Sequence, residues 1–379
     1  MILKKKVLLI ATVQSHIGQF HKPLMQMLKE SGWEIHVAAR DNLAEKDGLT
    51  LEYPDRVFDV PFQRSPFDKR NIRAFREIKK ILAENHYDII HCNTPVGGII
   101  GRAAGNKYRK AGTQVFYTAH GFHFYKGSPP KNWILYYPVE KWLSRFTDKL
   151  ITINKEDYEL ARKKFHCAVY HIHSVGANSS KFHPISAEEQ EKQKKELGLE
   201  GRILVNVGEL LPNKNQKTAI LAMKKVTRRM PDVKLLIAGN GPEKDNLENL
   251  IRQQDLEHHV KLLGYTTKLE KYLQVCDLEV ACSIREGLGL NVIEAMLCGK
   301  TVIASVNRGH RELVRDKWNG RLVDSEDAAA FADAIIEVLS DSELKNTMES
   351  RCIEFAKRYT DLQVKQELKL IYGENSCCG

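Results

Sequence analysis

The feature that most constrains the fold of this chain is a regular alternation of short β-branched runs with longer amphipathic stretches. Short runs of this kind predict buried strands, and apolar residues spaced by three or four positions predict helices between them. Strands and helices that alternate in this way favour βαβ units and a parallel sheet. Because both halves of the chain show the alternation, we expect an α/β protein with two Rossmann-like, doubly wound domains.

Five strands are predicted in each half. In the first half they are Val7–Ala11, Glu34–Ala38, Ile89–Cys92, Gln114–Thr118 and Lys149–Ile153. In the second half they are Ile203–Val207, Lys234–Ala238, Val260–Leu263, Leu278–Ala281 and Thr301–Ala304. The helices of the second half are predicted to begin near Gln216, Lys244, Lys268, Leu290 and Arg311. In the first half, the stretch Asn71–Glu84 is predicted to bury an apolar stripe of Ile72, Phe75, Ile78, Ile81 and Leu82.

The length of 379 residues exceeds what one ordinary core supports. A turn-rich segment at 173–178 precedes a charged helical pattern at Ser186–Leu197, for which Ser186 is a suitable N-cap. We therefore expect one domain at 1–180, a second at 181–355, and a terminal helix and tail at 356–379 that pack back toward the first domain. Sheets of this type bind ligands at the carboxyl ends of their strands, so we expect the two domains to face a central cleft.

Composition excludes several other classes of protein. Apolar residues make up 42% and charged residues 28% of the chain, close to the averages for soluble globular proteins. The eight cysteines contain no C-x-x-C pair and mostly occupy apolar stretches, which predicts reduced thiols without a disulfide or zinc site. The apolar run that starts at Val7 is too short to span a bilayer. We expect a cytoplasmic protein that does not cross the membrane.

The net charge of +10 is concentrated in the first half. Residues 1–180 contain 28 Lys and Arg against 17 Asp and Glu, whereas the remainder is close to neutral. A basic lobe of this kind attracts nucleic acid or the anionic inner leaflet of a membrane, or it is simply solvated. No nucleic-acid-binding motif accompanies the charge, so we expect no nucleic-acid partner.

The strongest chemical signal is the segment Glu286–Glu294, which follows a predicted strand and opens a predicted helix. Gly287 and Gly289 allow the backbone amides of the loop, including those of Leu288 and Leu290, to approach an anion. The helix N-terminus adds its partial positive charge, so a diphosphate could bind there without a metal. The two carboxylates at its ends could then accept hydrogen bonds from hydroxyl groups. A capped helix with a surface glutamate is the structural alternative.

Two further loops follow strands in the second half. Lys214 lies in the loop after Gly208 and could supply the countercharge to a diphosphate, although an exposed lysine is the simpler interpretation. Gly241 belongs to Ala238-Gly-Asn-Gly-Pro-Glu243, where glycines permit a nucleotide to approach or form a tight turn. Neither signal is specific alone.

In the first half, Gly18 follows the first predicted strand and His120 follows the fourth, and we expect both loops to face the cleft. His120 could hydrogen-bond a substrate hydroxyl, whereas His91 at a strand end more simply satisfies polar groups of the core. His120 and His123 have no third ligand nearby in sequence, so no metal site is predicted. The acidic residues Asp277 and Glu279 open a buried strand and are interpreted as structural.

Taken in this order, the loops around Gly18, His120, Lys214, Gly241 and Glu286–Glu294 resemble those of the family 4 retaining glycosyltransferases, which have the GT-B fold. The resemblance covers essentially the whole chain. The stretch Tyr117–Tyr125 is similar to that of bacterial enzymes that build exopolysaccharide or capsule repeat units on a lipid carrier.

The resemblance implies a specific division of labour. In the second domain, Glu294 would bind the ribose, Glu286 the sugar, and Lys214 with the amides of 288–290 the diphosphate of a nucleotide-sugar, most simply a UDP-sugar. In the first domain, which would bind a lipid-linked or saccharide acceptor, His120 would lie near the transferred sugar and Gly18 near the phosphates. The reaction would need no cofactor or metal. The enzyme would act at the anionic inner face of the cell membrane as a peripheral protein.

Two departures from the family pattern concern phosphate binding. Many relatives carry an arginine after the glycine at position 208, where this chain has Glu209, and the first glycine loop contains Gly18 without a second glycine. Two other functions are compatible with the sequence. A UDP-sugar 2-epimerase would bind the same donor without needing an acceptor, and a basic surface-binding protein would need no donor at all.

Overall fold

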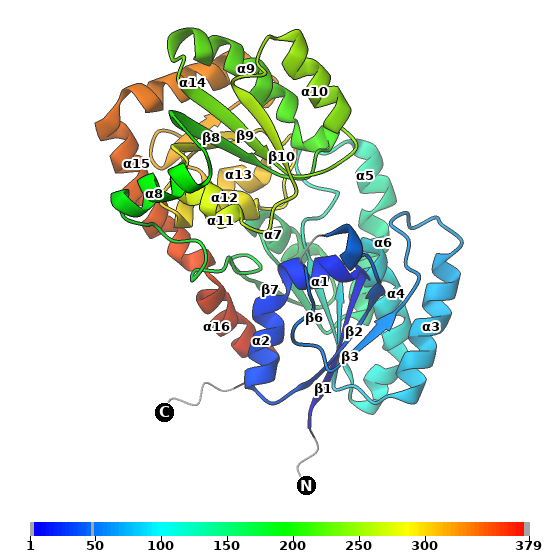
Figure 1. Ribbon diagram of the computed structural model, residues 1–379. Coiled ribbons are helices and arrows are strands. Elements are labelled where there is room, and N and C mark those ends of the chain that lie inside the picture. The colour runs from blue at the N-terminus through cyan, green and yellow to red at the C-terminus, as the bar shows by residue number, and fades with distance from the viewer. Residues whose placement is uncertain (1–3, 47–48, 375–379) are drawn as a thin grey trace. The chain divides into compact units, whose positions relative to one another are not determined.

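The computed structural model describes residues 4–46 and 49–374, and these form two compact units (Figure 1). Unit 1 comprises Met1–Gly176 with Asp361–Gly379, and unit 2 comprises Ala177–Thr360. The division therefore falls after Gly176 and not after residue 180, and the chain rejoins unit 1 at Asp361 and not at residue 356. Gly176 fixes this point because it has a φ of 86° and a Cβ there would lie 2.9 Å from the Cα of Asp361.

Unit 1 is built on a seven-stranded sheet in the order β3-β2-β1-β4-β5-β6-β7. All neighbouring strands are parallel, and Val7 of the central β1 pairs with Ile35 of β2 and Ile89 of β4. The strands are β1 (Lys6–Val13), β2 (Glu34–Arg40), β3 (Arg56–Asp59), β4 (Ile89–Asn93), β5 (Gln114–Ala119), β6 (Lys149–Thr152) and β7 (Ala168–His171).

Helices cover both faces of this sheet (Figure 1). They are α1 (Gln14–Phe20), α2 (Lys22–Glu30), α3 (Asn71–Glu84), α4 (Pro95–Gly105), α5 (Pro130–Leu135), α6 (Tyr137–Leu143), α7 (Lys155–Lys164) and the C-terminal α16 (Asp361–Tyr372). Helices α3 and α4 pack together over one face, and α16 packs against α2 over the other. Tyr372 anchors α16, since its hydroxyl lies 2.5 Å from Nδ1 of the buried His91.

Unit 2 is built on a six-stranded parallel sheet in the order β10-β9-β8-β11-β12-β13. The strands are β8 (Arg202–Val207), β9 (Val233–Ala238), β10 (Val260–Gly264), β11 (Leu278–Ala281), β12 (Thr301–Ser305) and β13 (Gly320–Val323). The helices are α8 (Ala187–Glu196), α9 (Gln216–Arg229), α10 (Lys244–Gln253), α11 (Leu269–Val275), α12 (Leu290–Leu297), α13 (Arg308–Leu313), α14 (Ala328–Ser340) and α15 (Ser342–Ala356). Ser186 caps α8 in a reciprocal capping box with Glu189, as a serine at this position predicts.

All ten predicted strands are present, but β3, β7 and β13 were missed. Each of these three is the short outer strand at an edge of its sheet. Strands β3 and β7 have no fully buried residue, so they lack the apolar run by which a central parallel strand is recognised. The apolar stripe predicted on α3 is also only partly buried: Ile78 and Leu82 reach the core, whereas Ile72 is 57% exposed.

The order of the strands determines where each sheet can bind a ligand. In unit 1 the direction of winding reverses between β1 and β4, and in unit 2 it reverses between β8 and β11. Loops that leave the carboxyl ends of such strand pairs diverge and leave a crevice at the sheet edge. The loop before Lys214 follows β8 and the loop before Glu286 follows β11, so both lie at the crevice of unit 2.

Candidate active site

The loops after β8 and β11 are tied together by asparagine side chains and backbone. Asn213 accepts a hydrogen bond from the amide of Ile284 at 2.8 Å, and its side chain donates to the carbonyl of Arg285 at 2.9 Å. Asn215, which has a left-handed φ of 54°, donates to the carbonyl of Ser325 at 2.7 Å. These bonds hold the short helical turn Pro212–Lys214 in a fixed place beside the Glu286 loop.

Lys214 and Glu286 form an ion pair between the loops after β8 and β11. The lysine Nζ lies 2.6 Å from Oε1 of Glu286, and both side chains are largely buried. Burial alone would raise the pKa of the Glu286 carboxyl, but the charge and hydrogen bond of Lys214 outweigh it and lower that pKa below its ordinary value. Glu286 is therefore ionised near pH 7, and Lys214 supplies a fixed positive charge.

Glycines shape the backbone on both sides of this ion pair. A Cβ at Gly208 would lie 3.2 Å from Cδ of Lys214, so the glycine leaves room for the lysine side chain. Gly289 has a φ of 107° at the start of α12, a conformation that side chains rarely adopt. Gly287, Leu288 and Gly289 thus lead directly into Leu290, the first residue of that helix.

Gly241 has a structural reason to be glycine. A Cβ at this position would lie 2.3 Å from the carbonyl oxygen of Leu210. The turn after β9 therefore packs on the backbone of the loop after β8. This contact favours the tight-turn interpretation of Gly241, and the turn supports the loop that carries Lys214.

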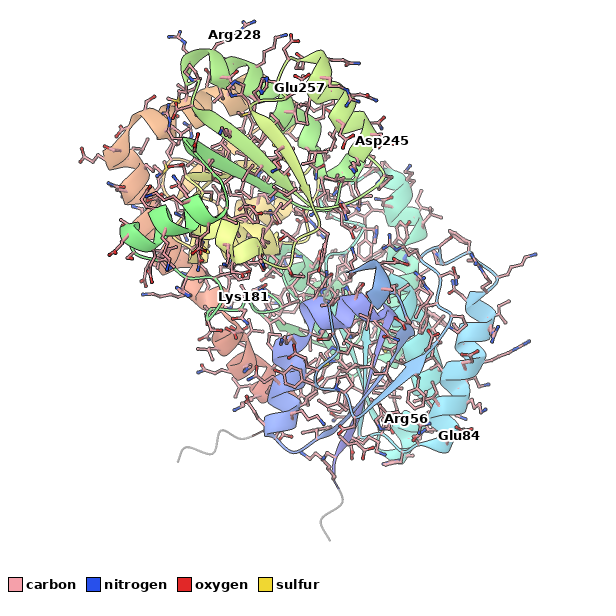
Figure 2. All side chains as sticks on the ribbon, in the orientation of Figure 1. Arg56, Glu84, Lys181, Arg228, Asp245 and Glu257 are labelled. Carbon is pink, nitrogen blue, oxygen red and sulfur yellow. The ribbon has the colours of Figure 1, made fainter. Side chains whose placement is uncertain are left out.

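Glu294 lies on the second turn of α12 and belongs to a group of acidic residues. Burial, together with the nearby carboxyl of Glu279, raises the pKa of Glu294 to about 8. Lys181, labelled in Figure 2, acts in the opposite direction on Glu294, and its Nζ lies 3.1 Å from Glu270. The neutral form of the Glu294 carboxyl is therefore favoured more than in an exposed glutamate.

Glu279 is fully buried on β11 beneath this group. Its Oε1 accepts a hydrogen bond from the Asn291 side chain at 2.7 Å, and its Oε2 has no hydrogen-bond partner among the described residues. Burial raises the pKa of this carboxyl to about 8. Its location in a buried strand agrees with the structural interpretation, and its hydrogen bond fixes Asn291 in the first turn of α12.

His310 was not singled out from the sequence, although it lies against the candidate site. It is fully buried on α13, and a Cβ at Gly289 would lie 3.3 Å from its ring. Its Nδ1 lies 3.0 Å from the Asn307 side chain, and its charge interaction with Glu286 is one of the contributions to the pKa of that carboxyl. The sequence did not place His310 on a helix, because α13 begins at Arg308, three residues before the predicted start near Arg311.

In unit 1, His120 has two imidazole neighbours that sequence spacing did not reveal. Its Nε2 lies 3.2 Å from Nε2 of His16, and the ring of His21 stands edge-on to it at 5.1 Å between centroids. The prediction that no third ligand lies near His120 was therefore wrong. Burial lowers the pKa of His120 to about 4 and lowers the pKa of His16 and His21 well below its ordinary value, so all three rings are neutral at pH 7.

The remaining predicted residues of unit 1 occupy different surroundings. Gly18 lies inside helix α1, so the expected phosphate-binding loop after β1 is a helix that begins at once at Gln14. His123 stacks obliquely on Tyr136 and is not part of the histidine group. His91 bonds Tyr372 with one nitrogen and Thr118 with the other at 2.7 Å, which confirms its role in the core.

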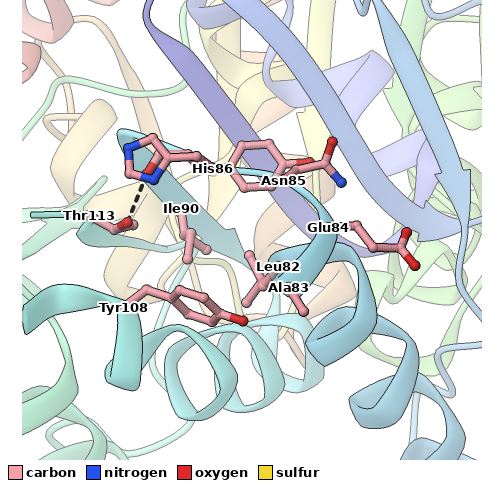
Figure 3. A pocket seen from close by; sticks show the side chains of 9 residues that line it. Leu82, Ala83, Glu84, Asn85, His86, Ile90, Tyr108 and Thr113 are labelled. Carbon is pink, nitrogen blue, oxygen red and sulfur yellow. Dashed lines mark hydrogen bonds between the residues drawn. The ribbon is translucent and has the colours of Figure 1, made fainter. Parts of the chain in front are cut away.

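A surface pocket of unit 1 lies elsewhere (Figure 3). Leu82, Asn85, Tyr108 and Thr113 are among its lining residues. It lies near the amino ends of β4 and β5, whereas His120 follows the carboxyl end of β5. It therefore has no part in the candidate site.

Comparisons with known proteins agree with this architecture. The family model Glycosyl transferase 4-like matches residues 6–154, and the model Glycosyl transferases group 1 matches residues 187–358. EpsD of Bacillus subtilis, which is named as a glycosyltransferase, is 42% identical over 376 residues, covering 98% of this chain and 97% of EpsD. UDP-Gal:alpha-D-GlcNAc-diphosphoundecaprenol alpha-1,3-galactosyltransferase of Escherichia coli is 29% identical over 82% of each chain.

Solved structures show the same fold. HepE of Anabaena in complex with UDP-glucose superposes with a TM-score of 0.79 at 21% identity, covering 98% of this chain and all of HepE. Sucrose-phosphate synthase of Thermosynechococcus elongatus gives a TM-score of 0.79 at 21% identity, covering 98% of this chain and 99% of that chain. The GT-B fold predicted from the sequence is confirmed.

The chain belongs to the glycosyltransferases, because it is 42% identical to EpsD over nearly its whole length and the two family models match its two units. It is an enzyme, a hexosyltransferase with two Rossmann-like units, and the epimerase and non-enzymatic alternatives are set aside.

Proposed function

We propose that this enzyme is a retaining transferase of family 4 that moves a hexose or N-acetylhexosamine from a UDP-sugar to a lipid-linked or saccharide acceptor. The observation that carries the proposal is the Lys214–Glu286 pair, held at the N-terminus of α12 with Glu294 about one turn further on. The E. coli relative named above uses UDP-galactose and a diphosphoundecaprenol acceptor, which supports a UDP-sugar donor and a lipid-linked acceptor here.

The donor residues divide into phosphate-binding and hydroxyl-binding groups. Lys214 and the amides of Leu288, Gly289 and Leu290 stabilise the diphosphate as the sugar–phosphate bond breaks, and UDP leaves with the bonding electrons. Glu286, ionised through its pairing with Lys214, accepts hydrogen bonds from the sugar.

Glu294 accepts hydrogen bonds from the ribose hydroxyls. Gly208 and Gly241 shape the loops that approach the donor, while Gly18 of α1 lies beside the side chains of Leu49 and Leu51. His120, neutral at pH 7, hydrogen-bonds a sugar hydroxyl through a ring nitrogen.

We propose that the reaction needs neither cofactor nor metal. Lys214 and the α12 N-terminus provide the positive charge that a divalent cation supplies in other phosphate sites. Transfer should therefore persist in EDTA. A complete loss that Mg²⁺ or Mn²⁺ restores would contradict this part of the proposal.

We further propose that unit 1 attaches reversibly to the anionic inner face of the cell membrane. Helices α5 and α6 expose Ile134, Leu135 and Trp142, with Lys131 and Lys141 beside them. Large exposed apolar side chains flanked by cations suit an anionic lipid surface, where each cation contributes about 1 kcal/mol. Among the described residues, no helix is long and apolar enough to span a bilayer.

Several cations of the basic first half are paired with carboxylates of the protein itself. Arg102 is buried and lies 2.8 Å from Glu140, and Arg109 pairs with Asp148. On α3, Arg73 pairs with Glu77 and Lys80 lies 3.9 Å from Glu84. The basic surface is therefore weaker at α3 and α4 than the sequence predicts.

Sedimentation with phosphatidylglycerol vesicles tests the attachment. We expect wild type to pellet at low salt and less at high salt, because lipid charge is screened within a Debye length. The double variant Ile134→Ser, Trp142→Ser should pellet less, and the triple variant Arg70→Glu, Arg73→Glu, Lys80→Glu measures the contribution of α3. Equal pelleting of the double variant and wild type would contradict attachment through α5 and α6.

The donor proposal is tested by a thermal-shift screen of nucleotide-sugars. A ligand at about 100 times its dissociation constant stabilises the fold by about 2.7 kcal/mol. The best donor is then incubated with and without lipid-diphosphate acceptors, and UDP and product are measured. UDP release that depends on the acceptor supports transfer, whereas conversion of the donor sugar without an acceptor would indicate an epimerase.

A further inference from the structure

Three histidine side chains of unit 1 converge although they come from separate segments. His16 lies on α1, His21 lies at the junction of α1 and α2, and His120 follows β5. One ring nitrogen from each lies within 4.8 Å of the other two. The convergence follows from the fold, because α1 begins directly at the end of β1 and β5 lies two strands away in the same sheet.

The spacing of these nitrogens is close to that of a metal site. Two imidazole nitrogens bound at the usual zinc distance in a tetrahedral site lie about 3.3 Å apart. The Nε2 atoms of His16 and His120 are 3.2 Å apart. Small rotations of the rings would bring His21 to the same distance, since its centroid lies 5.3 Å from that of His16.

His21 provides a second, independent observation. Its side chain is 4% exposed, and its Nε2 has no hydrogen-bond partner among the described residues. An unpartnered buried nitrogen costs about 1–3 kcal/mol, which a bound ligand would recover. By contrast, both ring nitrogens of the nearby His91 are hydrogen-bonded to protein groups.

We propose that His16, His21 and His120 bind a zinc ion, with a fourth coordination position open to water. Neutral imidazoles favour zinc and other late transition metals, whereas the group contains no carboxylate of the kind that Mg²⁺ or Mn²⁺ prefers. The three rings are already in the neutral form that coordinates a metal.

Zinc at this site inhibits transfer. It withdraws the His120 nitrogen from the sugar hydroxyl, so the inhibition rests on the proposed role of His120. Zinc binding does not depend on that role, and it is measured separately from activity.

Zinc binding is measured on the full chain with a competing chromophoric chelator at neutral pH. The protein carries Cys377→Ser and Cys378→Ser, because adjacent cysteines can themselves bind zinc. We expect one tight zinc site per chain. His21→Gln and His16→Gln should each weaken zinc binding at least about tenfold, while His86→Gln, at an exposed histidine of the same unit, should leave it unchanged. Equal affinity in all four proteins would overturn the proposal.

Cobalt(II) distinguishes the ligand set. We expect the visible absorption of a four-coordinate site without a thiolate charge-transfer band, and both should be lost in His21→Gln. A thiolate band in the wild-type spectrum would overturn the assignment to histidines.

Activity is then titrated with zinc, each variant being compared with its own zinc-free rate. Zinc should inhibit the wild type, and EDTA should reverse the inhibition. Half-inhibition of His21→Gln should require at least about tenfold more zinc. Tight binding without inhibition would overturn the inhibitory role and would also argue against His120 acting on the sugar.

Discussion

The carboxyl edges of the two sheets are built from opposite kinds of chemistry. In unit 2, the edge carries the Lys214–Glu286 ion pair and the acidic residues Glu279 and Glu294. In unit 1, the edge carries neutral imidazoles, and the Nε2 atoms of His16 and His120 lie 3.2 Å apart. A fixed charge suits a charged diphosphate, whereas neutral rings suit hydroxyl groups. Two sheets of the same topology therefore provide different recognition chemistry through the loops that follow their strands.

One buried group beside each edge responds to pH in the opposite direction to the other. Burial lowers the pKa of His21 well below its ordinary value, so this group stabilises unit 1 above about pH 6.5 and less as the pH falls. Burial raises the pKa of Glu279 to about 8, so its contribution to unit 2 is present below about pH 4.5 and is lost as the pH rises through 8. These two groups thus weaken unit 1 in acid and unit 2 in alkali.

The largest effect is expected at Glu286. Glu286→Ala should lower kcat about a hundredfold, because the carboxylate contacts the sugar whose bond is breaking and its loss frees Lys214 from its partner. Glu286→Gln keeps the shape of the side chain without its charge, so its kcat should lie between those of the wild type and Glu286→Ala. Initial rates at saturating donor measure this, and an unchanged kcat in both variants would remove Glu286 from the site.

Removing the cation should have the next largest effect. Lys214→Ala should lower kcat/KM for the donor about tenfold or more, the usual scale for a charge-assisted contact to phosphate. Lys217→Ala, which removes an exposed lysine on the adjacent helix, is the matched control. If both variants keep full activity, Lys214 serves only as the partner of Glu286.

Glu294 should affect donor binding more than the chemical step. Glu294→Ala should raise the donor KM about tenfold with a smaller change in kcat, because ribose contacts are made equally before and during transfer. Glu257→Ala removes an exposed carboxyl of the same unit and serves as the control (Figure 2). Calorimetric titration with UDP that gives the same affinity for Glu294→Ala and wild type would contradict the ribose assignment.

The smallest effect concerns stability and tests the contribution of Glu279 in alkali. Glu279→Gln keeps the hydrogen bond with Asn291 but cannot ionise, so it should raise the Tm by about 2–4 °C at pH 9 and by less at pH 6. Differential scanning fluorimetry across this range measures the change. A Tm difference that does not grow with pH would show that the carboxyl of Glu279 is not buried as a neutral acid.

The fold could be predicted further than the site. Central parallel strands can be predicted from apolar runs such as Ile89–Cys92, whereas edge strands such as Arg56–Asp59 lack such a run. The loop that contains Glu286 was found because glycines precede a helix start, a local pattern. His16, His21 and His120 were not connected, because the contact joins the ends of β1 and β5 and only the order of strands brings them together.

The return of α16 to unit 1 has a consequence for how the protein is made. The helix is encoded at the end of the chain, yet Tyr372 bonds His91 and Glu367 bonds His173 in the unit that is synthesised first. Unit 1 therefore remains without α16 while all of unit 2 is translated. During that time the surface of α2 that packs against α16 is uncovered. Unit 2 contains neither α2 nor α16, so all residues of the domain synthesised second are present before those of the first.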